Sequence, residues 1–318
     1  MRAVVQRVTY SNVKVDGNIV GEINPMKTVT IITPTYNRAG LLKNLYQSLE
    51  QQSNKDFEWL IVDDGSTDHT KEAVEGIINK ASFRVDYIWK ENGGKHTALN
   101  VGIKTIHTEL TMIVDSDDQL LPNAVDEICK VHRKYSSHDE IGVYSFLRCY
   151  SNGKPIVSLD AEEFVDSYVK YRIKENRPGD MAEVFKTLVL KKFSFPEFQG
   201  ERFISEDVVW IQIGLRYQYA FINKPIYQCE YLEGGLTAND KPMKFTSPCG
   251  SMLRGKMLMS RECGIIQNFK GAIIYDCYRR KLVNAHLDER LKLDLRDKVM
   301  CFFCKPISIY YFARWRKR

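Results

Sequence analysis

Residues 28–68 read TVTIITPTYNRAGLLKNLYQSLEQQSNKDFEWLIVDDGSTD, and this stretch decides the fold. It predicts a short apolar strand over 29–32, a helix over 41–51 and a second strand over 57–62. Short apolar strands that alternate with amphipathic helices are typical of a parallel sheet with helices on both faces. The stretch therefore predicts the first unit of an α/β domain.

The same alternation continues downstream. We expect a helix over 70–79, a strand over 85–89, a helix over 95–106 and a strand over 110–114. In such sheets ligands bind beyond the carboxyl ends of the strands. The residues that directly follow each strand are therefore the candidates for a functional site.

Polar loops follow the first two predicted strands, PTYNR at 34–38 and DDGSTD at 63–68. A carboxylate in such a loop can accept the imide N–H of a uracil while an aromatic ring covers the face of the base. Taken alone, however, the second loop is equally typical of a turn followed by a helix cap, because Ser, Thr and Asp favour both.

A third loop, ENGGKH at 91–96, precedes the helix that contains Ala98, Leu99 and Asn100. Paired glycines let the backbone approach a ligand closely, and a lysine at the start of a helix can meet a phosphate. The loop lacks the Walker pattern of a P-loop. A plain turn is the alternative.

Three carboxylates follow the next strand in IVDSDD, at Asp115, Asp117 and Asp118. Such a cluster repels itself unless a cation is present. Hard oxygen ligands suit Mn or Mg, which would bridge to a diphosphate and neutralise the charge of a leaving group. The alternative is a solvated acidic turn before the helix near Pro122.

The succession PTYNR, VDDGSTD, NGGKHTALN and VDSDD resembles family 2 of the inverting glycosyltransferases over residues 27 to 125. Further along, Ser205, Glu206 and Asp207 with Trp210 are similar to the Glu-Asp motif of that family. The resemblance implies an α/β fold of the GT-A (Rossmann-like) type that binds a nucleotide-sugar, followed by a C-terminal helical extension. It also implies Mn or Mg as cofactor.

The resemblance assigns a role to each matched residue. The donor-binding residues would be Pro34, Tyr36, Asn37, Arg38, Asp63, Asp64, Lys95, Asn100, Asp115 and Ser116. The metal ligands would come from Asp117, Asp115 and Asp118, with Asp117 the safest choice because two alignments are open. Asp207 would be the catalytic base and Glu206 its orienter or substitute, although a bare acidic pair at a helix start is also typical of a cap.

The segment YLEGGLT at 231–237 resembles the mobile loop that follows the last core strand in many family members. Its two glycines suit a hinge, so we expect it to close over the donor and exclude water. The alternative is an ordinary loop into the helical tail.

The expected reaction moves a sugar from a nucleotide-diphospho-sugar, by family habit a UDP-sugar, to an acceptor hydroxyl on a growing glycan or lipid-linked saccharide. Two other functions stay open. A sugar nucleotidyltransferase would usually have a first loop richer in glycine and arginine than PTYNR. A non-catalytic module that binds a sugar nucleotide or a glycan would have less reason to keep the acidic motifs intact.

Three segments are expected: 1–25, 26–235 for the GT-A domain, and 236–318 for the helical extension. Residues 1–25 alternate apolar and polar positions around Asp16-Gly17, which predicts a β-hairpin. They resemble the start of D-aminoacyl-tRNA deacylases, but the rest of that enzyme does not follow. We interpret them as a fused leader. After Tyr150 the pattern is less regular, with a β-rich stretch before helices over 250–300.

The net charge is +6, and Arg314, Arg316, Lys317 and Arg318 concentrate positive charge in the tail. Eight cysteines without a signal peptide indicate reduced thiols in the cytoplasm. The apolar run 299–311 is too short to span a bilayer and is interrupted by Lys305 and Pro306. It either lies on the inner membrane face or packs on its own domain. We expect no nucleic-acid partner, and a homo-oligomer stays open.

Overall fold

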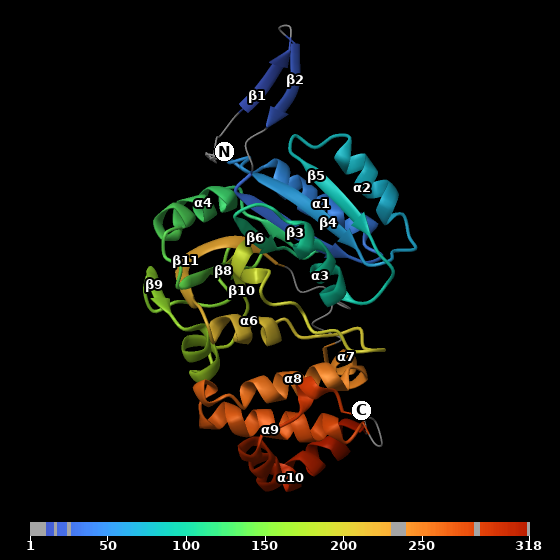
Figure 1. Ribbon diagram of the computed structural model, residues 1–318, viewed down its shortest axis with the longest axis vertical. Coiled ribbons are helices and arrows are strands. Elements are labelled where there is room, and N and C mark those ends of the chain that lie inside the picture. Colours follow the sequence, from blue (N-terminus) through green and yellow to red (C-terminus); the bar gives the residue numbers. More distant parts are fainter. Residues whose placement is uncertain (1–10, 16–17, 24–26, 230–239, 283–286, 317–318) are drawn as a thin grey trace, which may run out of the picture.

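The computed structural model describes residues 11–15, 18–23, 27–229, 240–282 and 287–316 (Figure 1). Within these ranges a nine-stranded sheet has the order β5-β4-β3-β6-β10-β8-β11-β7, with β9 paired to β11. Helices cover both faces of this sheet, and a group of C-terminal helices lies at the opposite end of the molecule from the N-terminal hairpin.

The first half of the sheet has the predicted architecture. Its four strands are parallel neighbours: β3 (Val29–Thr35), β4 (Phe57–Asp63), β5 (Val85–Trp89) and β6 (Leu110–Ile113). They alternate with α1 (Ala39–Glu50), α2 (Thr70–Ile78) and α3 (Lys95–Thr105). Leu45 of α1 and Val74 of α2 pack in the core on one face of the sheet, whereas Leu99 of α3 belongs to the core on the other face.

The second half of the sheet is mixed rather than parallel. β10 (Met181–Lys186) lies antiparallel between β6 and β8 (Ile141–Cys149), and β11 (Gln218–Gln228) runs parallel to β8. The short strands β7 (Gln119–Leu120) and β9 (Glu163–Asp166) pair antiparallel with β11. β8 lies upstream of the stretch expected to be β-rich, and nearly all of its residues are buried.

Helices connect the strands of this second half. They are α4 (Ala124–Tyr135), the π-helical turn η1 (Val169–Lys174), α5 (Thr187–Leu190) and α6 (Asp207–Gly214). The chain passes from β3 outward to β4 and β5, and then returns to β6 on the other side of β3. The sheet therefore has a topological switch point beside the carboxyl end of β3, where an α/β sheet opens a crevice for a ligand.

The predicted helical C-terminal part is present. It consists of α7 (Asp240–Thr246), α8 (Pro248–Leu258), the 3-10 turn η2 (Arg261–Cys263), α9 (Ile265–Arg279), the 3-10 turn η3 (Glu289–Leu291) and α10 (Leu295–Arg316). α8 and α9 cross closely, because a Cβ atom on Gly255 would lie 2.7 Å from the carbonyl oxygen of Gly271. α10 packs against α9 at the end of the molecule (Figure 1). No described helix has the length and hydropathy needed to cross a bilayer. The predicted boundary at 235/236 lies outside the described residues.

At the N-terminal end, β1 (Ser11–Val15) and β2 (Asn18–Ile23) form the predicted antiparallel hairpin. Its expected turn, Asp16-Gly17, lies outside the described residues. The two strands make a sheet of their own, separate from the nine-stranded sheet. That residues 1–25 are a fused leader stays a prediction.

Candidate active site

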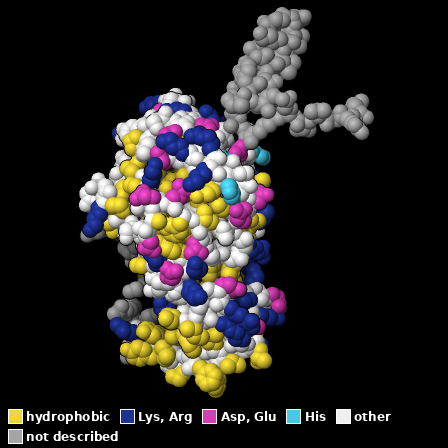
Figure 2. Space-filling view, turned by 90° about the vertical axis from the view of Figure 1, so that its left-hand side faces the viewer, with side chains coloured by type: hydrophobic (Ala, Val, Ile, Leu, Met, Phe, Trp, Pro, Cys, Tyr) yellow, Lys and Arg dark blue, Asp and Glu magenta, His cyan; other side chains and the backbone are white. Residues whose placement is uncertain are grey.

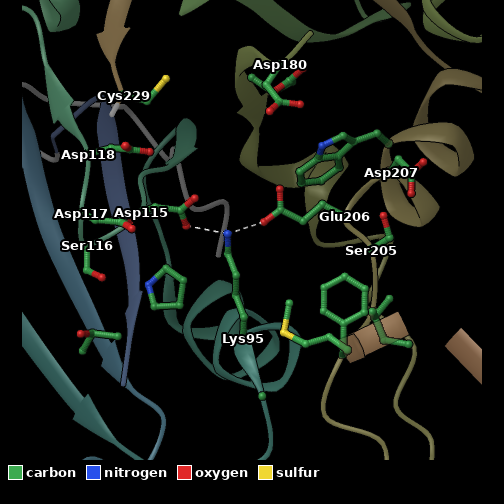
Figure 3. A pocket seen from close by; sticks show the side chains of 18 of the residues that line it. Lys95, Asp115, Ser116, Asp117, Asp118, Asp180, Ser205, Glu206, Asp207 and Cys229 are labelled. Atoms are coloured by element: carbon green, nitrogen blue, oxygen red, sulfur yellow. Dashed lines mark ion pairs between the residues drawn. The ribbon is translucent and has the colours of Figure 1, made fainter. Parts of the chain in front are cut away.

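A cleft of about 720 Å³ opens at the carboxyl ends of β3, β4 and β6 and reaches the start of α6 (Figure 3). Eleven of the candidate residues line it: Pro34, Tyr36, Arg38, Asp64, Lys95, Asp115, Ser116, Asp117, Asp118, Glu206 and Asp207. The sequence motifs, which lie as much as 173 residues apart between Pro34 and Asp207, thus meet in one place. Asn37, Asp63 and Asn100 do not line the cleft.

Asp64 fixes the loop between β5 and α3. Its buried carboxylate accepts hydrogen bonds from the backbone N–H of Gly93 at 3.0 Å and of Gly94 at 2.7 Å, and from Lys90 Nζ at 2.7 Å. Gly94 has a φ of 97°, and a Cβ atom there would lie 2.1 Å from the carbonyl oxygen of Arg202. The position therefore requires glycine, both for its backbone conformation and for space.

The three candidates outside the cleft hold its walls. The side-chain oxygen of Asn37 accepts from the backbone N–H of Thr67 at 2.8 Å, which ties the first loop to the second. Asp63 accepts from Tyr87 Oη at 2.7 Å and from the N–H of Ser66 at the same distance. The Asn100 amide donates to the carbonyl of Phe195 and to Glu197. In this structure these three side chains hold neighbouring parts of the chain in place and do not face the cleft.

The three carboxylates after β6 have separate partners. Asp115 Oδ1 lies 2.5 Å from Lys95 Nζ, and Asp117 Oδ2 lies 2.6 Å from Arg38 Nη1. Asp118 accepts a hydrogen bond of 2.7 Å from the hydroxyl of Tyr227. Lys95 and Arg38 therefore supply positive charge that offsets the repulsion within this cluster, and binding of a metal ion there stays a prediction.

Two of these carboxylates fit a metal ion bound together with a diphosphate. Among the described residues no group of three potential metal-ligating side chains converges. Asp118 is buried, and burial raises the pKa of its carboxyl to about 7. Because this carboxyl binds a proton more readily and already accepts a hydrogen bond from Tyr227, it is less suited to bind a metal ion than Asp115 or Asp117. Asp115 and Asp117 remain partly exposed to the cleft. One or two carboxylates with phosphate oxygens are a usual set for Mg²⁺.

Lys95 joins the two halves of the cleft. Its ammonium group lies between Asp115 and Glu206, 2.7 Å from Glu206 Oε1, and both ion pairs are drawn in Figure 3. Burial opposes the charged form, but the two carboxylates outweigh it and raise the pKa of Lys95. Burial likewise acts against ionisation of Asp115, and the neighbouring Lys95 nevertheless lowers its pKa. Lys95 and Asp115 are therefore both charged near neutral pH.

Asp207 begins α6 and is held from the C-terminal helices. Its Oδ2 accepts a hydrogen bond of 2.7 Å from Arg254 Nε of α8. Its Oδ1 is buried and has no hydrogen-bond partner among the described residues. Neither oxygen caps the helix, and Glu206 makes no side-chain capping bond either. A buried carboxylate oxygen without a partner is costly unless a ligand supplies a donor.

The wall opposite the loops that follow β3, β4 and β6 was not predicted. It contains Arg148, Tyr168, Arg172, Asp180 and Glu183. Arg148 near the end of β8 donates to the carbonyl of Met181 at 2.8 Å and stacks 4.3 Å above the ring of Tyr227. Arg148 lies within β8, a strand that the sequence analysis did not predict, so the rule that sites follow strand ends does not find it. No motif marks Glu183, which reaches the cleft only because β10 inserts between β6 and β8.

Glu183 gives the cleft a pH-dependent carboxyl. Burial raises its pKa from an ordinary value of 4.5 to about 7. The folded protein then binds this proton more tightly than the unfolded chain, so the stability that it contributes is present below about pH 4 and lost as pH rises to 7. The free energy of unfolding of Glu183→Gln, taken relative to that of wild type, should rise by roughly 1–3 kcal/mol as pH increases from 5 to 8, as measured by urea denaturation. A parallel pH dependence of the two proteins would contradict this assignment.

Two predicted features cannot be placed. The loop 231–237 lies outside the described residues, as do Lys317 and Arg318. Met243 of α7 does line the cleft, so the chain returns to the site directly after the gap. Closure of the loop over a donor stays a prediction.

Comparison with known sequences gives consistent matches. Residues 30–177 match the family model described as Glycosyl transferase family 2. An uncharacterized glycosyltransferase of Rickettsia felis is 30% identical over 222 residues, which are 69% of this chain and 35% of that protein. The teichoic acid poly(glycerol phosphate) polymerase of Staphylococcus epidermidis is 28% identical over 155 residues, 46% of this chain and 21% of that protein. The chain spans about a third of the length of the first curated relatives it matches.

Solved structures show the same fold. The crystal structure of S. aureus TarS 1-349 in complex with UDP-GlcNAc has a TM-score of 0.60 at 20% identity, and the match covers 89% of this chain and 80% of that one. The UDP complex gives a TM-score of 0.58 over 85% and 77% of the two chains. The fold is therefore of the GT-A type. Residues 30–177, a little under half of the chain, are similar to family 2 of the glycosyltransferases.

Proposed function

We propose that this chain transfers a sugar from a UDP-sugar to an acceptor hydroxyl with inversion at the anomeric carbon. The observation that carries the proposal is the Lys95 bridge: its ammonium group lies 2.5 Å from Asp115 Oδ1, just after β6, and 2.7 Å from Oε1 of Glu206, the neighbour of Asp207 in sequence. Donor-type and base-type residues thus share one cleft. TarS, which has the same fold, has been crystallised in complex with UDP and with UDP-GlcNAc. These complexes support a uridine donor.

The donor would lie along the ends of β3, β4 and β6. Tyr36 is exposed at the mouth of the cleft, where its ring can cover the face of the base, and Asp64 lines the wall beside it. Arg38 and Lys95 present positive charge toward the position of the diphosphate. Ser116 is buried between Asp115 and Asp117, which are partly exposed to the cleft, and shapes the floor.

Mn or Mg would be held by Asp117 and Asp115 together with diphosphate oxygens. When bound, the ion neutralises negative charge on the departing nucleoside diphosphate. Asp118 would stay protonated or hydrogen-bonded to Tyr227, and would position the acidic turn rather than ligate the ion.

Asp207 would act as the general base. Its Oδ1, which has no protein partner in the described part of the chain, would accept the proton of the acceptor hydroxyl while Arg254 holds Oδ2. The acceptor oxygen then forms a bond to the anomeric carbon as the bond from that carbon to the diphosphate breaks on the opposite face. The anomeric configuration inverts. Glu206, which is paired with Lys95, would orient this arrangement.

The acceptor would be a hydroxyl on a growing glycan or a lipid-linked saccharide. The match to a teichoic acid poly(glycerol phosphate) polymerase favours a polymer acceptor over a small molecule. Tyr168 and Trp210, which line the cleft near Asp207, offer aromatic surface on which a sugar ring can stack.

A screen of nucleotide-sugars tests the proposal directly. We expect release of UDP from one UDP-sugar when Mn or Mg is present, with a large loss of rate after treatment with a chelator and recovery on adding the ion back. GDP- and ADP-sugars are the matched controls. Pyrophosphate formed from a sugar 1-phosphate and a nucleoside triphosphate would instead show a nucleotidyltransferase. Binding of nucleotide-sugar without turnover under any condition would indicate a non-catalytic module.

A further inference from the structure

The outer face of α10 is an exposed apolar surface. Phe302 and Phe303 are 70% and 71% exposed, although both rings are fully apolar. The same face carries Leu295, Val299, Ile307, Ile309 and Tyr310, all of them exposed. The first turn of α9 adds Ile265, Ile266 and Phe269. We call these ten residues the α9–α10 apolar patch.

The patch is continuous rather than scattered. Cys304 of α10 lies against the carbonyl of Phe269, with a distance of 4.0 Å from Sγ to the oxygen, so the two helices meet at the middle of the patch. Figure 2 shows hydrophobic side chains gathered at this end of the molecule, with basic side chains along its border. Exposed apolar patches of this kind on soluble folds mark interaction sites.

α10 is anchored, so its outer face is not exposed through fraying. Met300, Cys304 and Ser308 are buried against α9, and Arg296 donates to the carbonyl of Met259 at 2.9 Å. The two expectations for residues 299–311 therefore apply to opposite faces of one helix. One face packs on the chain's own helices, and the other is presented outward.

The exposed charges on α10 itself have one sign. Lys298, Lys305 and Arg314 are exposed on α10. Asp297, the one acidic residue between 295 and 314, is buried. Just outside the patch, Asp294 accepts from the backbone N–H of Asp297, and Glu262 accepts from Ser260. The helix thus offers cations and apolar rings but no exposed carboxylate.

We infer that the α9–α10 apolar patch docks on the surface of an anionic lipid bilayer. A helix surface that places aromatic and aliphatic side chains at the headgroup boundary, with Lys and Arg beside them, has this composition. Tyr310 suits the interface, because Tyr rings favour the boundary between headgroups and chains. A second copy of the chain fits less well. A two-fold symmetric contact through this face would place cations against cations.

Vesicle sedimentation with the full chain tests this surface. We expect the protein to sediment with phosphatidylglycerol–phosphatidylcholine vesicles and much less with phosphatidylcholine alone, with binding that weakens as salt increases. The variant Phe302→Ser/Phe303→Ser should lower the bound-to-free ratio by about tenfold or more. The variant Lys298→Gln/Lys305→Gln should lose most of the preference for anionic vesicles and its salt dependence.

The matched control is Leu188→Ser on α5, which removes an apolar side chain that is 78% exposed on the sheet part of the molecule. It should bind vesicles like wild type, and circular dichroism should show that all variants are folded. Wild-type protein that stays in the supernatant with anionic vesicles would overturn the inference. So would patch variants that bind as well as wild type, or that change only the oligomeric state in light scattering. These outcomes do not depend on whether the chain transfers a sugar.

Discussion

Asp207→Asn is expected to lower the turnover number for sugar transfer by about 10²- to 10⁴-fold, the usual contribution of a general base. Asparagine keeps the shape of the side chain and can still accept the hydrogen bond from Arg254, but it cannot take a proton from the acceptor. Asp207 makes no described contact with the loops that would hold the donor. UDP affinity, measured by calorimetry, should therefore stay within a few fold of wild type.

Glu206→Gln is the matched comparison for this experiment. It removes the carboxylate that pairs with Lys95 and leaves Asp207 with Arg254 untouched. We expect a smaller drop in turnover than for Asp207→Asn. If Glu206→Gln were inactive and Asp207→Asn retained most of its activity, the roles of the two carboxylates would have to be exchanged.

The half of the cleft formed by the loops after β3 to β6 could be predicted because its residues follow a local rule. Each strand from β3 to β6 is a short apolar run, and the polar residues directly after it must lie at one edge of a parallel sheet. Tyr36, Asp64 and Asp117 therefore line one cleft, as their positions after strands predicted. The rule does not separate side chains that face a ligand from those that hold a loop. Asp63 and Asp64 are neighbours in sequence and both hold loop backbone, yet only Asp64 also lines the cleft.

The rest of the site depends on contacts that no local pattern encodes. Glu183 reaches the cleft because β10 inserts antiparallel between β6 and β8, a pairing set by tertiary packing. Arg254 reaches Asp207 from a helix that begins 41 residues downstream of it, at Pro248. The partners of the acidic cluster, Lys95 and Arg38, were both identified from sequence, but their pairing with particular carboxylates was not. Which carboxylate a long lysine or arginine side chain pairs with depends on the distances in the folded structure, which the sequence pattern does not give.

The ion pair between Arg254 and Asp207 also connects the C-terminal helices to the proposed catalytic base. α8 carries Arg254 to Asp207, α9 crosses α8 at Gly255, and α10 packs on α9. The surface that would face a bilayer and the carboxylate that would activate an acceptor are thus connected through three packed helices. This arrangement suits an acceptor presented at a lipid surface, because docking would set the orientation of the cleft relative to that surface.

Lys95→Met should weaken UDP-sugar binding by about 10- to 100-fold, because it removes a charged donor from the diphosphate position. Methionine retains most of the length and volume of the side chain. Without the ammonium group, Asp115 and Glu206 face each other across the cleft with no shared cation. Since both lysine and Asp115 are about a quarter exposed in wild type, we expect the free energy of unfolding at pH 7 to fall by roughly 1–3 kcal/mol.

The pH dependence of this loss distinguishes an electrostatic effect from a packing effect. Lys95 lowers the pKa of Asp115 in the folded protein, so the stability from this pair is present above the ordinary carboxyl range near pH 4 and disappears as pH falls below it. The difference in unfolding free energy between wild type and Lys95→Met should therefore shrink as pH is lowered from 7 toward 3. Lys95→Arg, which keeps the charge, should retain most of the stability at pH 7. A stability difference that is constant with pH would mean that Lys95 contributes through packing, and the proposed link between the donor and base halves would lose its electrostatic basis.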